Sequence, residues 1–205
     1  LGPSESEPTA YFTPLSDFEL PEHLRPVAES WHKLATSLHY SGPVAWKVKA
    51  GFTLKQHAPL VGPCYQNFSY LRDWNFPDEP TSEGIVFWIP RLLQGSTRRN
   101  VGEQKALLSK VRQDYDLPES HLSSFGNLAM LAGLILAHYK ATDERVPLDC
   151  CWVRTDVCGT GGLRLDLGYF DELGLSCAYW YWGGSRYGGL GVFAVQICAA
   201  AGARA

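Results

Sequence analysis

The stretch LAMLAGLILA, residues 128–137, decides how the rest of this chain must be arranged. It is apolar on every side of a helix, and a helix of that kind lies in the core of a protein. Its ten residues are too few to cross a bilayer, which takes about 20. The small residues of this region form a stripe: Gly126, Ala129, Gly133 and Ala137. We therefore expect a core helix over 122–140, with the stripe in close contact with a sheet.

Two amphipathic helices are expected earlier in the chain. Residues 26–40 repeat apolar side chains at helical spacing, with Pro26 in the first turn and a glycine and a proline directly beyond the end. Residues 101–118 show the same spacing and end at a proline. Each pattern predicts a helix with one buried face.

Strands are expected on both sides of these helices. Residues 44–52 alternate in polarity and predict a half-buried strand, whereas residues 84–90 are continuously apolar and predict a central strand. The last third of the chain predicts four consecutive strands joined by short turns, at 150–157, 163–170, 175–182 and 190–198. In the strand at 163–170 we expect four residues on the core face, Leu163, Leu165, Leu167 and Tyr169, with Phe170 on the opposite face.

These patterns predict an α+β fold in which one antiparallel sheet carries a C-terminal β-meander and about three helices pack on one face. The chain has 205 residues, 45% of them apolar and 19% charged, which is enough apolar material for a packed core. We expect a single domain over 17–199, between a flexible N-terminal tail or cloning remnant at 1–16 and a flexible C-terminal tail at 200–205.

Charge and cysteine content restrict the partners. The formal net charge is −3, and the basic cluster Arg98-Arg99 is too small for a phosphate-binding surface. The start of the chain has no apolar signal segment, and the six cysteines are interpreted as reduced thiols. We therefore expect a cytoplasmic protein that binds neither nucleic acid nor membranes. Its partner would be another protein or a small ligand, and its oligomeric state is left open.

Known catalytic and metal-binding patterns are missing from the sequence. The glycine-rich stretches 159–162 and 183–185 lie between strands, so they are turns rather than phosphate loops. No CxxC or HExxH spacing occurs, and the adjacent Cys150 and Cys151 point to opposite faces of a strand. We therefore assign no catalytic residue, no metal ligand and no cofactor, and we favour a protein that is not an enzyme.

One enzymatic alternative stays open. The segment 55–84 contains four prolines and many aromatic residues, and it either hides short strands or folds over the body as a lid. A small hydrolase or transferase would have its site under this segment and would use Asp156, Arg154 and a histidine. The competing interpretation of Arg154 and Asp156 is an ion pair on the surface of a strand.

The sequence YWYWGGSRYGGLG, residues 179–191, has two interpretations: its aromatic rows pack in or against the core, or one row forms a surface for a ligand or partner. Strand alternation places its tyrosines on one face and its tryptophans on the other, and the register that decides which face meets the helices is open. We expect a non-enzymatic binding or interaction domain with an exposed aromatic surface; the third candidate is a carbohydrate-binding module. The expected binding residues are Tyr70, Trp74, Trp180, Trp182, Arg186 and Tyr187.

Overall fold

A computed structural model describes residues 11–118, 124–181, 184 and 186–199, including every side chain among them except those of Trp180, Tyr181 and Ala199. The described strands are β1 (Phe12–Leu15), β2 (Ala45–Val48), β3 (Gly84–Trp88), β4 (Trp152–Cys158), β5 (Arg164–Asp171), β6 (Gly174–Tyr181), β7 (Leu190–Gly191) and β8 (Val195–Ala199). The described helices are η2 (Glu22–Leu24), α1 (Arg25–Ser37), α2 (Leu54–Val61), η3 (Tyr65–Asp73), α3 (Val101–Asp114), α4 (Leu128–Thr142) and η4 (Thr160–Gly162).

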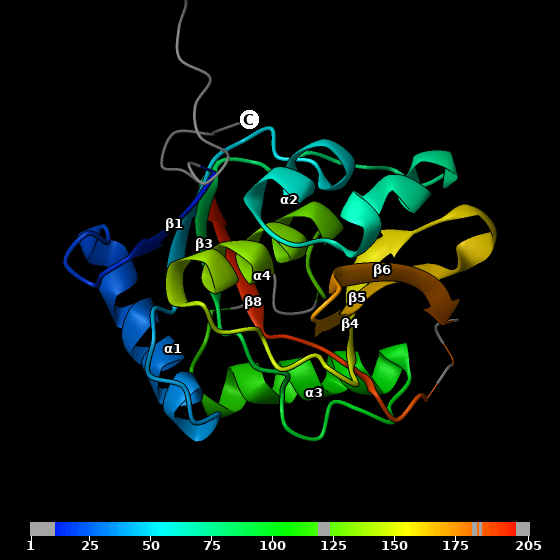
Figure 1. The fold of residues 1–205 in the computed structure, drawn as a ribbon. Coiled ribbons are helices and arrows are strands. Elements are labelled where there is room, and N and C mark those ends of the chain that lie inside the picture. The colour runs from blue at the N-terminus through cyan, green and yellow to red at the C-terminus, as the bar shows by residue number, and fades with distance from the viewer. Residues whose placement is uncertain (1–10, 119–123, 182–183, 185, 200–205) are drawn as a thin grey trace, which may run out of the picture.

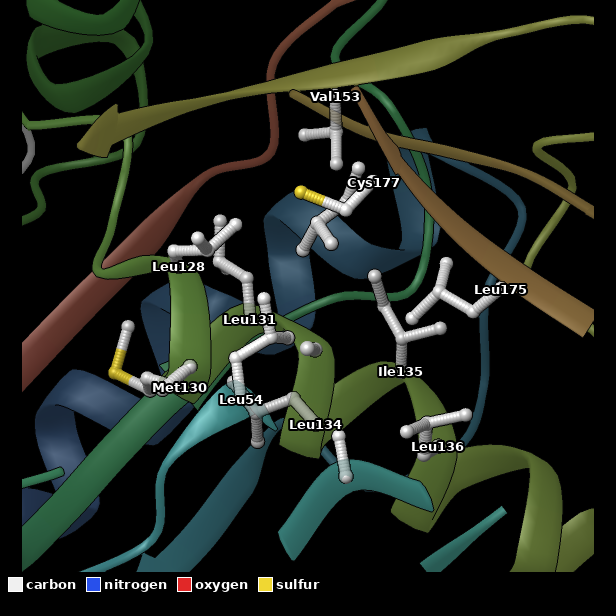
Figure 2. Close-up of a cluster of buried hydrophobic side chains, with 14 of the residues drawn as sticks. Leu54, Leu128, Met130, Leu131, Leu134, Ile135, Leu136, Val153, Leu175 and Cys177 are labelled. Carbon is white, nitrogen blue, oxygen red and sulfur yellow. The ribbon is translucent and has the colours of Figure 1, made fainter. Parts of the chain in front are cut away.

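The apolar helix α4 lies in the middle of the molecule, as its sequence predicted (Figure 1). One large cluster of buried side chains joins α4 to α2 and to strands from both ends of the chain. In Figure 2, Ile135 of α4 points toward Leu175 and Cys177 of β6. The helix begins later than residue 122, because the Asn127 side chain accepts a hydrogen bond from the N–H of Met130 at 3.0 Å and caps the first turn.

Gly133 of the predicted stripe of small residues has a direct packing role on α4. A Cβ atom at this position would overlap the ring of Phe12, so the absence of a side chain lets β1 approach the helix closely. The predicted contact between helix and sheet is therefore confirmed. The same contact shows that part of the expected N-terminal tail, 1–16, is structured, because residues 12–15 form β1 and pair with β2.

The expected single sheet is two sheets. The first has the strand order β1-β2-β3-β8, and the second has the order β6-β5-β4-β7. The expected last strand, 190–198, is divided: β7 pairs parallel with β4, whereas β8 crosses to the first sheet and pairs antiparallel with β3. The run is apolar except for Gln196, so either sheet could bury it, and local patterning does not choose between them.

The expectation of helices on one face is also wrong. Helices α1 and α3 cover one face of the first sheet and share the second cluster of buried side chains, while α4 covers the other face (Figure 1). The Trp31 ring of α1 stacks on Phe87 of β3 with ring centroids 6.0 Å apart. The first sheet is therefore buried on both sides, and the second sheet packs against the far side of α4. None of the described helices combines the length and the apolar composition needed to cross a bilayer.

A β-bulge changes which side chains β5 buries. Leu165 and Leu167 face the core, as expected. The register then shifts between Gly168 and Asp171, and Tyr169 adopts a left-handed backbone with φ 45°. Phe170 is consequently buried against Tyr139 of α4, and Tyr169 packs on the opposite face of the sheet. The predicted faces of Tyr169 and Phe170 were therefore wrong, because strict alternation along a strand does not reveal the extra residue of a bulge.

Candidate functional site

An open hollow of about 270 Å³ lies where η3 meets the second sheet. Five aromatic side chains and three small residues line it: Tyr65, Tyr70, Trp74, Trp152, Tyr169, Ser176, Cys177 and Ala178. None of these residues carries a charged side chain, so recognition here depends on ring faces and a few polar groups. We call this site the aromatic hollow.

The wall formed by η3 contains an unusual backbone turn. Gln66, Asn67 and Phe68 are consecutive residues with φ of 47°, 50° and 56°, all in the left-handed region. Non-glycine residues rarely adopt it, and each costs about 1–2 kcal/mol. The turn is held by the N–H of Asn67, which donates to the carbonyl of Cys64 at 2.8 Å, and by Phe68, which is 2% exposed in the core. It sets the spacing between Tyr65 and Tyr70.

Tyr70 fastens this wall to the edge of the second sheet. Its hydroxyl donates to the carbonyl of Cys177 and accepts from the N–H of Cys177, both at 2.9 Å. These backbone groups belong to edge strand β6, so the tyrosine satisfies polar groups that an edge strand leaves open. Burial raises the pKa of Tyr70, which keeps its hydroxyl protonated.

The next aromatic residue, Trp74, packs against β6 from the same side. Its ring stacks on Tyr179 with centroids 4.5 Å apart and planes inclined by 27°. The Tyr179 hydroxyl donates to the carbonyl of Asn75 at 3.0 Å. The segment 55–84 therefore packs against edge strand β6 through η3, while its other helix, α2, packs against α4.

The opposite wall comes from β4 and β5. The rings of Trp152 and Tyr169 meet at right angles with centroids 4.8 Å apart. The β-bulge turns Tyr169 to this face. A side-chain hydrogen bond with Tyr187 raises the pKa of Tyr169 and joins the hollow to the loop before β7.

The structure brings together some of the predicted binding residues. Tyr70 and Trp74 line the aromatic hollow, and Tyr187 lies beside it through its contact with Tyr169. Arg186 lies in the same loop and forms an exposed ion pair with Glu103 at 2.7 Å. Trp182 lies outside the described residues.

The structure describes the backbone of Trp180 within β6 but not its side chain. Two aromatic lining residues outside the segment 55–84 were missed by the sequence analysis: Trp152, whose strand was expected, and Tyr169, which had been placed on the core face. The small lining residues Ser176, Cys177 and Ala178 were also not predicted. The bulge in β5 carries no recognisable local signal.

The register of β5 and β6 shows on which face of the second sheet Tyr179 lies. Tyr179 lies opposite Leu165, and Cys177 lies opposite Leu167. Both leucines are fully buried against α4, so Tyr179 lies on the core side. The register shifts beyond this pair, between Leu165 and Arg164. Tyr179 itself is half-buried under Trp74 and Phe76.

A second hollow, of about 310 Å³, bears on the enzymatic alternative because Pro77 and Glu79 of the segment 55–84 border it beside Asp156. The Asp156 carboxylate accepts hydrogen bonds from the N–H groups of Phe125 and Gly126 at 3.0 and 2.9 Å. It thus holds the loop before α4. No histidine is present among the described residues that line this hollow.

Arg154 does not line that hollow. The expected ion pair between Arg154 and Asp156 is not formed. It is fully buried, and its Nε donates to Oε1 of Gln104 in α3 at 2.6 Å. Asp166 lies opposite Arg154 in the β4–β5 ladder and is also fully buried. Burial raises the pKa of Asp166 to about 7, and the charges of Arg154 and Arg164 oppose this rise.

The described part of the chain contains neither a metal site nor a disulfide bond. No group of three or more histidine, cysteine, aspartate or glutamate side chains within the described ranges could hold an ion. All six cysteines are described, and each is a free thiol. Comparison of the chain with protein-family models, with curated proteins and with solved structures found no match.

Proposed function

We propose that this protein is a non-enzymatic binding domain and that the aromatic hollow holds a group of its partner. The observation that carries the proposal is the convergence of five aromatic side chains on one uncharged hollow. They come from η3 and its end, from β4 and from β5, so the fold assembles them from distant parts of the chain. Sites for ligands combine such apolar walls with few polar groups.

Backbone conformation also supports the aromatic hollow as the binding site. Left-handed non-glycine residues occur in both walls, at Gln66–Phe68 and at Tyr169. Strain of this kind persists where the surrounding structure enforces it, and it is concentrated at functional sites. Without the bulge at Tyr169, the alternation of β5 would direct this ring into the core.

The lining of the hollow favours binding over catalysis. Cys177 is fully buried, and burial raises its pKa well above the usual value, so its thiol is a weak nucleophile. Within the described part of the chain, no acid, histidine or lysine lines the hollow beside Ser176. The proposal includes a cytoplasmic location and a protein or small-molecule partner.

The test is a ligand-observed NMR titration with small probes that present a ring or methyl groups: indole, N-acetylproline amide, methyl β-glucoside and choline. We expect at least one probe to bind the wild-type protein and to lose affinity in Tyr65→Ala, which removes one half-buried wall. Phe18→Ala is the matched control, because Phe18 is 92% exposed in the turn before η2 and does not line the hollow.

Two results would overturn the proposal. One is that none of the four probes binds the wild-type protein. The other is that Tyr65→Ala and Phe18→Ala bind the probes equally well. Binding of methyl β-glucoside alone would point to the carbohydrate-binding alternative at the same site.

A further inference from the structure

We infer that the aromatic hollow recognises a quaternary ammonium group, that is, a compact cation whose nitrogen carries only carbon substituents. This inference rests on the proposed function, since it names the chemistry that the same hollow accepts. Three observations carry it: the mutual angles of the rings, the engagement of the tyrosine hydroxyls, and the uncharged lining.

The rings that line the hollow are mutually inclined and do not form one flat platform. The planes of Tyr65 and Tyr70 are inclined by 63°, and those of Tyr70 and Trp74 by 75°. The planes of Trp152 and Tyr169 are perpendicular. A sugar ring stacks on one flat face, whereas a compact cation gains from several faces that enclose it, because each face carries the negative part of the ring quadrupole.

The tyrosine hydroxyls of the hollow already have partners in the protein. The Tyr65 hydroxyl accepts from Nε2 of Gln66 at 3.1 Å, and the Tyr70 hydroxyl is used twice by the backbone of Cys177. Tyr169 is hydrogen-bonded to Tyr187. A ligand that needs many hydrogen bonds, such as a sugar, therefore finds little here, while a quaternary ammonium group needs none.

The need for hydrogen-bond acceptors distinguishes a primary from a quaternary ammonium group, because only the primary group carries N–H donors. No carboxylate is present among the described residues that line the hollow. Asp166 lies opposite Ala178, at the floor of the hollow, and Arg154 lies opposite Asp166 in β4. The positive charge of Arg154 therefore offsets the negative charge of Asp166. A primary ammonium would lose its hydrogen bonds to water without replacement, and that loss is costly. A quaternary ammonium has no such bonds to lose and is attracted by the ring faces.

The experiment compares choline with 3,3-dimethylbutan-1-ol, its uncharged isostere, by calorimetric titration of the full chain. We expect choline to bind about 2- to 30-fold more tightly, the range that a cation–π interaction provides. Ethanolamine, with a primary ammonium group, should bind more weakly than choline.

Three variants assign the preference to the rings. Tyr65→Phe keeps the ring face and should keep the preference for choline. Tyr65→Leu keeps apolar contact without a ring and should reduce the preference, with little effect on the isostere. Tyr169→Leu repeats this test on the opposite wall in case Tyr65→Leu does not fold.

Equal affinity for choline and its isostere overturns the inference, as does a preference that persists unchanged in both leucine variants. If the two ligands bind equally and Tyr65→Ala abolishes both, the inference fails while the proposed function stands. If neither choline nor the other probes bind, both fail.

Discussion

The hydroxyl of Tyr70 bridges the N–H and the carbonyl of Cys177, which lies 107 residues further along the chain. One side chain thereby satisfies two backbone groups on the open edge of β6 and holds η3 in place beside the second sheet. The aromatic hollow depends on this connection, because Tyr65 and Trp74 lie on either side of Tyr70 in the same segment.

Replacing Tyr70 with phenylalanine should lower the free energy of unfolding by about 1–3 kcal/mol, because the two backbone groups of Cys177 lose their partner. Chemical denaturation measures this change, and amide hydrogen exchange at Cys177 should become faster. The control is Tyr65→Phe. Among the described residues the Tyr65 hydroxyl is hydrogen-bonded to the exposed side chain of Gln66, and its loss should cost little. Equal stability of the two variants would contradict the assigned role of Tyr70.

Replacing Gly133 with alanine should destabilise the protein by about 1–3 kcal/mol, since the new methyl group overlaps the Phe12 ring in a packed core. Thermal unfolding followed by circular dichroism measures the loss. Gly102→Ala in α3 is the matched control, because only the Asn100 side chain lies within 4 Å of the added atom, at 3.4 Å. That variant should keep its stability or gain up to about 1 kcal/mol.

A double variant separates the clash from other effects. Phe12→Leu should be destabilising alone, yet it should make Gly133→Ala less costly, because the smaller side chain leaves room for the methyl group. Strict additivity of the two changes would show that Phe12 is not what restricts position 133.

His138 should make the protein less stable in mild acid. It is 2% exposed on α4, packed against Trp88 and Tyr40, and both burial and the charge of Arg91 lower its pKa, with Glu144 acting in the opposite direction. The folded state therefore binds fewer protons than the unfolded state, so stability falls as the pH drops below about 6.5. The loss is about 1.4 kcal/mol for each unit by which the pKa is lowered.

Denaturation between pH 7.5 and pH 5 tests this effect. His138→Phe keeps an aromatic ring against Trp88 and should show a smaller loss of stability in acid than the wild-type protein. His23→Gln, an exposed histidine of η2, should leave the wild-type pH profile intact. A profile for His138→Phe that parallels the wild-type curve would rule out the histidine as its source.

Asp166 should act with the opposite sign. Its folded-state pKa of about 7 lies above its unfolded value, so its contribution to stability is fully present below about pH 4 and is lost as the pH rises through 7. Asp166→Asn lacks this titration, and its stability relative to the wild-type protein should therefore increase with pH, by roughly 1–4 kcal/mol between pH 4 and pH 8.

The measured quantity is the change with pH of the stability difference between Asp166→Asn and the wild-type protein. The cost of replacing the carboxylate beside Arg154 does not affect this change, because it is the same at both ends of the pH range. Urea denaturation of both proteins at pH 4, 6 and 8 is sufficient. A stability difference that does not change with pH, or that changes in favour of the wild-type protein, would contradict the raised pKa.

Local patterns were sufficient for much of the secondary structure. The spacing of apolar residues predicted α1, α3 and the central position of α4, and the β-rich runs predicted β2 to β6. The spacing of apolar residues over a few positions is enough to predict such elements, because it depends only on residues close together in the sequence. The same holds for the aromatic content of the segment 55–84, which marked Tyr70 and Trp74 before their surroundings were known.

Other features depend on partners that are distant in the sequence. The crossing of β8 to the first sheet and the burial of that sheet on both faces follow from which strand each apolar run meets. The left-handed turn at Gln66–Phe68 exists because Phe68 is anchored in the core and Tyr70 is held by β6. Neither condition is visible in a window of a few residues.

The sequence by itself determined that residues 128–137 form a buried helix with strands around it, because an all-apolar helix must be enclosed. Only the tertiary structure decided that Tyr169 leaves the core face and meets Trp152, since a single extra residue in β5 reverses the direction of every following side chain. The candidate site results from that reversal, combined with the attachment of η3 to the edge of β6.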